Sequence, residues 1–323
     1  MNALLRRNEF YLFLIFVVMS LAIGLVNTGF WSPVNMFTLL KNTVVMGVFS
    51  LGVLVVIVSG GIDISFPAFS VFAFYITTKY LVSIDYQGTI LLPFAMAIAI
   101  GGALGCLNAF FISTFRLAPL IVTLGTGSAA TGFLRAFVGT GIIPNLPPSM
   151  VAFSRFNLTE KNLADGSMIG LSGSLLIYAG LALLIWLGLT YTTVGRGVYC
   201  LGGDPVASLR VGFNNRRIQY FVYILAGALA GAAGIIHSSL IRQANPRDLE
   251  GFEMEVIAAV VLGGASLTGG RGTVLGTILG VFILVLIKSS LILVGIPSDW
   301  QKVAIGLVLI IATIVTAIRT KRA

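Results

Sequence analysis

The sequence has little charge, one histidine and two cysteines, and each scarcity excludes a class of protein. Charged residues make up 10% of the 323 residues and hydrophobic residues 57%. Soluble domains carry about 25% charged and about 45–50% apolar residues, so this chain lacks the charge to coat a water-soluble enzyme. Two cysteines, Cys106 and Cys200, are too few for a disulfide framework. The single His237 has no carboxylate or cysteine partner at ligand spacing, so we expect no metal site.

What the chain has instead is long apolar runs. A bilayer core of about 30 Å needs about 20 apolar residues as helix. Eight such runs begin around residues 10, 36, 90, 117, 172, 217, 273 and 300, and two shorter ones lie near 64–78 and 253–266. The pattern predicts an all-α polytopic membrane protein of about ten transmembrane helices, some short or interrupted, in a single transmembrane domain over residues 1–323.

The basic residues indicate an orientation. Arg6 and Arg7, the 191–217 loop and the C-terminal tail are basic, and an even number of spans places all three on one side. Short loops rich in Lys and Arg stay in the cytoplasm, so we expect both termini to be cytoplasmic. The net charge of +9 then reflects membrane topology and does not call for a nucleic-acid partner.

Glycines four residues apart predict close helix packing. Lipid provides no hydrophobic drive for helices to associate, so backbones must approach each other closely. The chain has 38 glycines, and the spaced ones include Gly101 and Gly105, Gly227 and Gly231, and Gly272, Gly276 and Gly280. We expect a compact bundle.

The stretch Ser59-Gly-Gly-Ile-Asp63-Ile-Ser65-Phe66-Pro67 joins two apolar runs. The glycine pair and Pro67 predict an interrupted helix. Broken helices at membrane depth often line a binding site, and a carboxylate there is costly, so its presence favours a function. The alternative is a tight cytoplasmic turn in which Asp63 and Ser65 cap the next helix. The residues alone leave both interpretations open.

A second stretch lies in the 191–217 loop and runs from Gly202 to Gly212. Asp204 followed by Pro205 predicts an N-cap with proline at the first helical position, and Gly212 ends a helix of about two turns. A short capped helix on this face suits docking into a groove of a soluble partner. An ordinary surface helix between two spans is the alternative.

The third stretch begins with two carboxylates, Glu253 and Glu255, and ends in a glycine-rich turn at 263–272. The carboxylates mark the outer end of a short span. Whichever of them faces the bundle is a candidate for lining a pathway.

These three stretches, in this order, resemble the permease subunit of bacterial ATP-binding-cassette (ABC) importers, in the subfamily for ribose, other simple sugars and autoinducer-2, which is related to the branched-chain amino-acid permeases. The resemblance covers residues from about 36 to 318. It implies a helical bundle in the bacterial inner membrane that forms a homodimer or pairs with a sister permease. It also implies docking on two ATPase subunits inside and one periplasmic solute-binding protein outside.

The resemblance assigns roles by position. Residues 203–212 become the helix that couples to the ATPase, through Gly203, Asp204, Pro205, Ser208, Arg210 and Gly212. Asp63 and Ser65 fall near the translocation path, and Glu253 and Glu255 belong to the third marker. We add Asn108, Thr123 and Thr126 to the pathway because they are polar residues in neighbouring spans.

Two positions depart from the family's pattern. Phe66-Pro67 stands where Val-Gly is usual, which affects the helix break and the cargo. Lys288 stands in the ninth span where an uncharged polar residue is usual, and a buried lysine needs a partner.

The resemblance implies alternating access, with no catalytic residue and no cofactor in this chain, because ATP and Mg²⁺ belong to the partner ATPase. The binding protein is expected to meet the 140–171 loop and the loop with Arg242 and Arg247. The competing hypothesis is an ion- or proton-coupled secondary transporter that uses Asp63, Glu253, Glu255 or Lys288 as titratable relays. The sequence does not distinguish pentose, hexose, nucleoside or autoinducer-2 as cargo.

Overall fold

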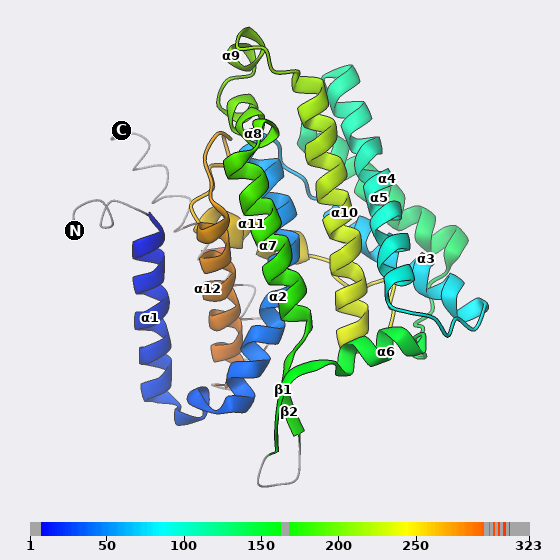
Figure 1. Ribbon diagram of the computed structural model, residues 1–323, viewed down its shortest axis with the longest axis vertical. Coiled ribbons are helices and arrows are strands. Elements are labelled where there is room, and N and C mark those ends of the chain that lie inside the picture. Colours follow the sequence, from blue (N-terminus) through cyan, green and yellow to red (C-terminus); the bar gives the residue numbers. More distant parts are fainter. Residues whose placement is uncertain are drawn as a thin grey trace.

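A bundle of long helices forms the body of the computed structural model (Figure 1). The structure describes residues 8–162 and 168–293, with single positions at 297, 300, 303, 306, 307 and 310. In this part of the chain, seven helical segments are long and apolar enough to cross a membrane. They are α1 (Asn8–Val26), α2 (Pro33–Val58), α4 (Leu91–Phe115), α5 (Pro119–Phe133) with its extension η2 (Leu134–Val138), α7 (Ser174–Tyr191), α10 (Asn215–Ile241) and α12 (Val274–Leu293).

The two expected short spans are also helices, α3 (Phe66–Ser83) and α11 (Phe252–Leu262). Four smaller helices connect the spans: η1 (Thr28–Trp31), α6 (Pro148–Arg155), α8 (Thr193–Gly203) and α9 (Pro205–Arg210). The expected helical polytopic fold is thus confirmed. The tenth expected span, beginning around residue 300, lies outside the continuously described residues.

One β-hairpin accompanies the helices in the described part of the chain. β1 (Asn157–Asn162) pairs antiparallel with β2 (Met168–Ser172) in the connection between α6 and α7. It projects from the end of the bundle opposite α9 (Figure 1). An open strand edge is not tolerated in hydrocarbon but is allowed in water, which is why the strands occur in a polar connection beyond the spans.

Helix α2 forms the centre of the bundle. The side chains from Val53 to Val58 are all at most 2% exposed, and α2 contacts α7, α10, α11 and α12. Its burial on every face, and not its hydropathy alone, places it in the middle, because lipid can also cover an apolar face. Its position brings its C-terminal end, and the break that follows, into the interior.

Glycine determines how closely α4 and α10 pack. A Cβ added at Gly101 would clash with the carbonyl oxygen of Gly227, and one added at Gly231 would clash with that of Ala97. These residues are among those whose spacing predicted close packing. Gly272 differs from the expectation, because it lies in the turn before α12.

Gly101→Ala is expected to destabilise the protein, whereas Gly102→Ala is not. The added methyl at residue 101 meets backbone, and such overpacking costs about 1–3 kcal/mol. At residue 102 the nearest atom to a new Cβ is 3.8 Å away, and replacing a mid-helix glycine by alanine there gains about 0.5–1 kcal/mol. Thermal unfolding in detergent measures both variants, and equal melting temperatures would contradict this packing.

Candidate functional site

The predicted interruption after α2 is present. The helix ends at Val58, and Gly60 adopts a left-handed conformation with φ of 85°. Residues 61–65 are irregular, and α3 starts at Phe66 with a proline in its first turn. Glycine is suited to residue 60 because the left-handed region carries a steric penalty for other residues.

The irregular segment lies inside the bundle. Asp63 is only 3% exposed. Hydrogen bonds through Ser65 connect it to Asn108 of α4 and Thr126 of α5. Asn108 is seven residues from the end of α4 and Thr126 seven residues from the start of α5, which is about 10 Å along each helix. The segment is therefore enclosed by the bundle and is not a turn exposed on its surface.

Four polar side chains form a continuous hydrogen-bond network at this depth. Asp63 Oδ1 accepts hydrogen bonds from Ser65 N at 2.7 Å and Ser65 Oγ at 2.6 Å. Asn108 Nδ2 donates to Ser65 Oγ at 2.9 Å, and Thr126 Oγ1 donates to Asn108 Oδ1 at 2.6 Å. Because buried polar groups are costly without partners, the network satisfies groups that no lipid contact could.

Thr123 joins the network to the backbone of the break. Its Oγ1 donates to Ile62 O at 3.3 Å and accepts from Ile64 N at 3.4 Å. One turn further, Gly127 lets α5 approach closely, since a Cβ there would lie 3.2 Å from Ser65 Cα. The structure therefore brings together five of the residues predicted to lie on the pathway, from the break, α4 and α5.

A cavity of about 530 Å³ lies on the other side of Thr123. Its wall on α5 runs from Thr123 to Gly132, about 14 Å of helix, and its volume falls in the range of small-ligand sites. The polar or charged residues on its wall are Thr123, Ser128, Thr131, Arg135, Asp248, Glu250 and Glu253. Of these, only Thr123 and Glu253 were predicted from the sequence to lie on the pathway. The hydroxyls of Ser128 and Thr131, in an apolar span, are a signal that could have identified these two residues.

The two carboxylates of α11 point in different directions. Glu253 lines the cavity, whereas Glu255 Oε2 accepts a hydrogen bond from Lys288 Nζ of α12 at 2.7 Å. Residues two positions apart on a helix do not share a face. The Lys288 ammonium also lies 5.9 Å from the centre of the Phe252 ring, so this lysine has the partner that its burial requires.

Two side-chain pairs, each with one carboxylate of the cavity wall, lie at the end of the cavity away from Thr123. Arg135 of η2 pairs with Glu250, and His237 Nε2 of α10 lies 3.4 Å from Asp248 Oδ2. His237, which has no carboxylate at ligand spacing in the sequence, has Asp248 as a neighbour because the segment after α10 folds back on the helix. Among the described residues, no group of three or more His, Cys, Asp or Glu could hold a metal ion.

The two loops expected to meet a binding protein lie together. Ile143 and Ala244 exchange backbone hydrogen bonds of 2.9 and 3.0 Å, and Arg242 Nε donates to Ser154 Oγ of α6 at 3.1 Å. Helix α6 and the β-hairpin lie at the end of the bundle opposite α9 (Figure 1). The loop that carries Asp248 and Glu250 therefore begins at this end of the bundle.

The short helix α9 is capped as its sequence predicts. Asp204 Oδ1 accepts hydrogen bonds from Val206 N at 2.8 Å and Ala207 N at 3.1 Å, and Gly212 follows with φ of 90°. Ser208 is buried, and its Oγ donates to Asn215 Oδ1 at 2.8 Å. This bond ties α9 to the start of α10.

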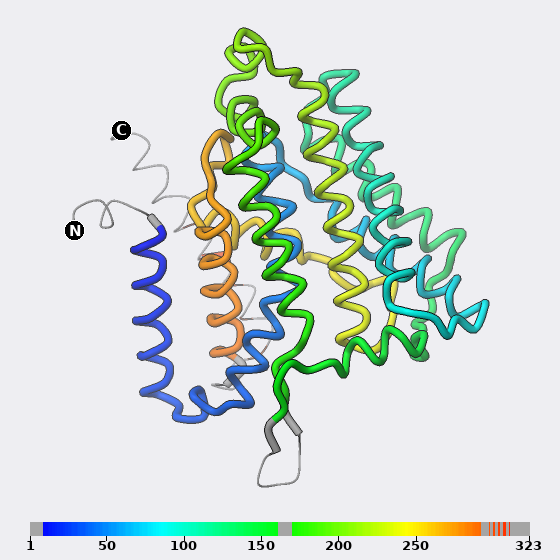
Figure 2. The backbone as a smooth tube through the Cα atoms, in the orientation of Figure 1, coloured from blue at the N-terminus to red at the C-terminus, as the bar shows by residue number. Residues whose placement is uncertain are grey.

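The remaining side chains of α9 face away from the bundle. Asp204 and Arg210 are exposed, and the apolar Val206, Leu209 and Val211 are 57%, 59% and 67% exposed. The turn that carries them projects beyond the other helices (Figure 2). Exposed apolar side chains grouped in this way are typical of a surface that contacts another protein or the membrane.

Glycines connect α9 to the break. A Cβ at Gly202, at the end of α8, would clash with Val58 O, and one at Gly269 would lie 2.8 Å from Gly60 Cα. Gly270 N donates to Val58 O at 2.9 Å. Three backbones, those of the break, the end of α8 and the turn after α11, therefore meet without side chains between them. We call this contact of residues 58–60, 202–203 and 269–270 the glycine junction.

Comparison with known proteins gives one family. The family model described as "Branched-chain amino acid transport system / permease component" matches residues 35–313. The ribose import permease protein RbsC of Bacillus subtilis (strain 168) is 31% identical over 303 residues, which cover 94% of this chain and 90% of that protein. No solved structure matches the chain.

Two further relatives agree. RbsC of Escherichia coli (strain K12) is 29% identical over 300 residues, 93% of this chain and 90% of that protein. The L-arabinose ABC transporter permease protein AraH of Azospirillum brasilense is 28% identical over 309 residues, 95% of this chain and 87% of that protein. The chain belongs to the branched-chain amino acid transport system permease family, as a multi-pass membrane permease subunit of bacterial ABC importers that is not itself catalytic.

Proposed function

We propose that this chain, as one transmembrane permease domain with both termini in the cytoplasm, moves a small hydroxylated solute from a periplasmic binding protein into the cell. The candidates are ribose or another simple sugar, a nucleoside-like solute and autoinducer-2. The observation that carries the proposal is the cavity between α3, α5 and α11, whose wall presents hydroxyl and carboxylate groups among membrane spans. The names of the relatives, which import ribose and L-arabinose, support this solute class.

The cavity is matched to hydroxyl groups. Thr123, Ser128 and Thr131 can each donate and accept, and Glu253 can accept from a solute hydroxyl. Behind this wall, the network of Asp63 and Asn108 holds the irregular backbone in place. We assign Asp63, Ser65, Asn108 and Thr126 the role of positioning the pathway, and Thr123 and Glu253 that of contacting the solute.

Energy enters through α9. The proposed partners are two ATPase subunits, which carry ATP and Mg²⁺ and receive α9 in a groove. Movement of α9 reaches the end of α8 and then, through the glycine junction, the backbone on either side of the break. Since backbone contacts backbone there, a shift of α8 moves the break directly and is not absorbed by rearrangement of side chains.

Two further partners complete the proposal. The outer layer formed by α6, the hairpin and the segment around Ala244 receives the binding protein.

Helix α5 carries cavity residues together with exposed apolar ones, including Ile121 at 69%, Leu124 at 49% and Phe133 at 52%. A second copy or a sister permease packs against these side chains, and α5 then lies between the two subunits.

The secondary-transporter hypothesis loses two of its four titratable groups in this structure. Glu255 and Lys288 pair with each other and not with the cavity, and membership of the family indicates an ATP-driven importer.

Uptake is expected to require the whole assembly. Proteoliposomes containing the chain, its ATPase and its binding protein should accumulate radiolabelled ribose only with hydrolysable ATP, because this chain provides the pathway and the ATPase provides the energy. Proteoliposomes with the chain alone should show no uptake under an imposed proton or sodium gradient. Gradient-driven uptake by the chain alone would overturn the proposal in favour of a secondary transporter.

A further inference from the structure

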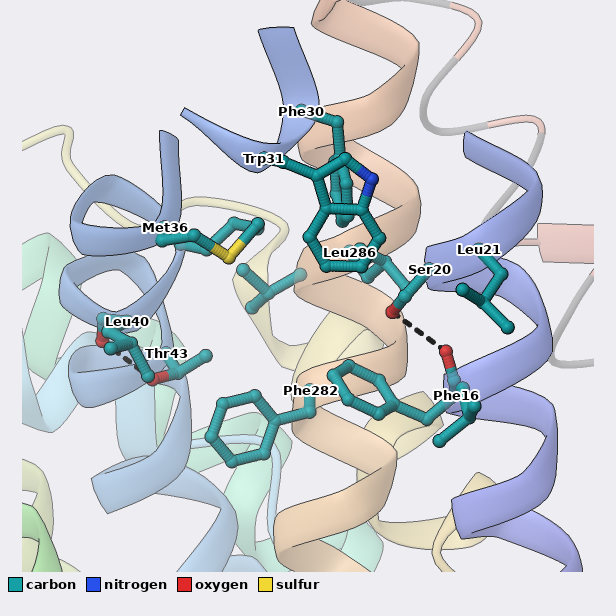
Figure 3. Close-up of a pocket in the computed structure, with 13 residues that line it drawn as sticks. Phe16, Ser20, Leu21, Phe30, Trp31, Met36, Leu40, Thr43, Phe282 and Leu286 are labelled. Carbon is teal, nitrogen blue, oxygen red and sulfur yellow. Dashed lines mark hydrogen bonds between the residues drawn. The ribbon is translucent and has the colours of Figure 1, made fainter. Parts of the chain in front are cut away.

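A second cavity, remote from the pathway, lies between α1, α2 and α12. It has a volume of about 340 Å³, and Phe16, Met36, Leu40, Phe282 and Leu286 project into it from the three helices (Figure 3). Helix α1 packs chiefly on α12 and on η1. The cavity therefore occupies the space that separates α1 from α2.

The wall of this cavity offers almost nothing polar. Ser20 and Thr43 are its hydroxyl residues, and both are already bonded within their own helices. Ser20 Oγ donates to Phe16 O at 2.8 Å, and Thr43 Oγ1 donates to Leu40 O at 2.7 Å (Figure 3). A buried water needs two to four polar partners, so water is a poor occupant. An apolar ligand suits the cavity.

The position of the cavity identifies that ligand. All three helices are membrane spans, so the surrounding medium is lipid. The cavity begins at η1 and follows α2 from Met36 to Thr43, about 10 Å of helix, which is less than half of the roughly 30 Å hydrocarbon core. It thus has the depth of one leaflet.

Trp31 marks the headgroup end of the cavity. It belongs to η1, is 52% exposed and lines the cavity, and tryptophan is enriched where hydrocarbon meets headgroups. A chain that enters at Trp31 and extends toward Phe282 would remain within a single leaflet.

We propose that this cavity is a binding site for one acyl chain of a phospholipid in the leaflet on the η1 side. The chain fills the space between α1 and α2 and attaches α1 to the bundle through apolar contact. If α9 faces the cytoplasm, as proposed above, this is the outer leaflet.

Photo-crosslinking tests the site. The full-length protein is reconstituted with a phosphatidylethanolamine that carries a diazirine in one acyl chain, irradiated and mapped by peptide mass spectrometry. Adducts are expected on the cavity side of α1 and α2, at residues such as Phe16 and Met36. Adducts confined to the outward face of α1, at residues such as Leu14 and Val18, would overturn the proposal. The absence of adducts on the cavity residues would also overturn it, and would indicate that a protein segment fills the cavity.

Matched tryptophan substitutions give a second readout. Val17→Trp places a ring in the cavity, whereas Val18→Trp places it on the 56% exposed outward face. The cavity adducts should be lost in the first variant and kept in the second. Leu39→Trp and Thr38→Trp repeat the comparison from α2, so a folding defect in one helix does not decide the result. Equal labelling within both pairs would contradict a lipid site.

Discussion

Leu209→Asp is expected to abolish ATP-driven uptake while the chain remains in the membrane in normal amounts. Leu209 is 59% exposed on α9, so the new carboxylate stays in water and folding is unaffected. Docking in an ATPase groove would bury it, and an isolated buried charge is prohibitively costly. Co-purification of the ATPase and uptake in proteoliposomes measure the loss. Val206→Asp should behave in the same way.

The control for this prediction is Ile84→Asp. Ile84 is 50% exposed and follows α3 at the end of the bundle away from α9. The carboxylate there should leave ATPase co-purification unchanged. If Leu209→Asp retained the ATPase as well as Ile84→Asp does, α9 would not be the docking element.

The cap of α9 offers a graded version of the same test. Asp204→Ala removes the acceptor of two backbone N–H groups, which costs about 0.5–2 kcal/mol of helix stability, whereas Asp204→Asn keeps an acceptor. Coupling should therefore fall further in the alanine variant. Arg210→Glu leaves the cap intact, so loss of transport in that variant reports on docking alone.

The local features of this fold were predictable because each depends on neighbours in the sequence. Span length follows from the apolar runs, and the end of α2 from the Gly60 region and Pro67. The cap at Asp204 depends on groups two and three residues away. Asn108 and Thr126 could be predicted as pathway residues for a different reason, because a polar residue in an apolar span needs a partner. Nothing in the sequence indicated that they would form a hydrogen bond with each other.

The pairings between distant residues were not predictable. Glu255 and Lys288 are 33 positions apart, and Arg135 and Glu250 are 115 apart. Such contacts depend on how helices are arranged, and the apolar periodicity of a lipid-facing helix carries little information about its neighbours. The same reason explains why the sequence indicated two carboxylates on α11 without indicating that Glu253 alone lines the cavity.

Cross-linking residues 135 and 250 is expected to block uptake reversibly. Arg135 of η2 and Glu250 pair at the end of the cavity away from Thr123, where we propose that the solute enters from the binding protein. Arg135→Cys and Glu250→Cys, in a background with Cys106→Ser and Cys200→Ser, allow a short bis-methanethiosulfonate to join them. Both native cysteines are free, so the background removes other targets.

Uptake should stop on cross-linking and return after reduction, whereas each single-cysteine variant treated in the same way should continue to transport. Full uptake by the cross-linked protein would show that the solute enters elsewhere.

The pair itself is easy to open, because the two side chains are 35% and 59% exposed and exposed ion pairs contribute only about 0–1 kcal/mol. We expect contact with the proposed binding protein to separate them. A covalent link should therefore be far more inhibitory than loss of the charges, and Arg135→Ala, measured beside the cross-linked protein, should still transport.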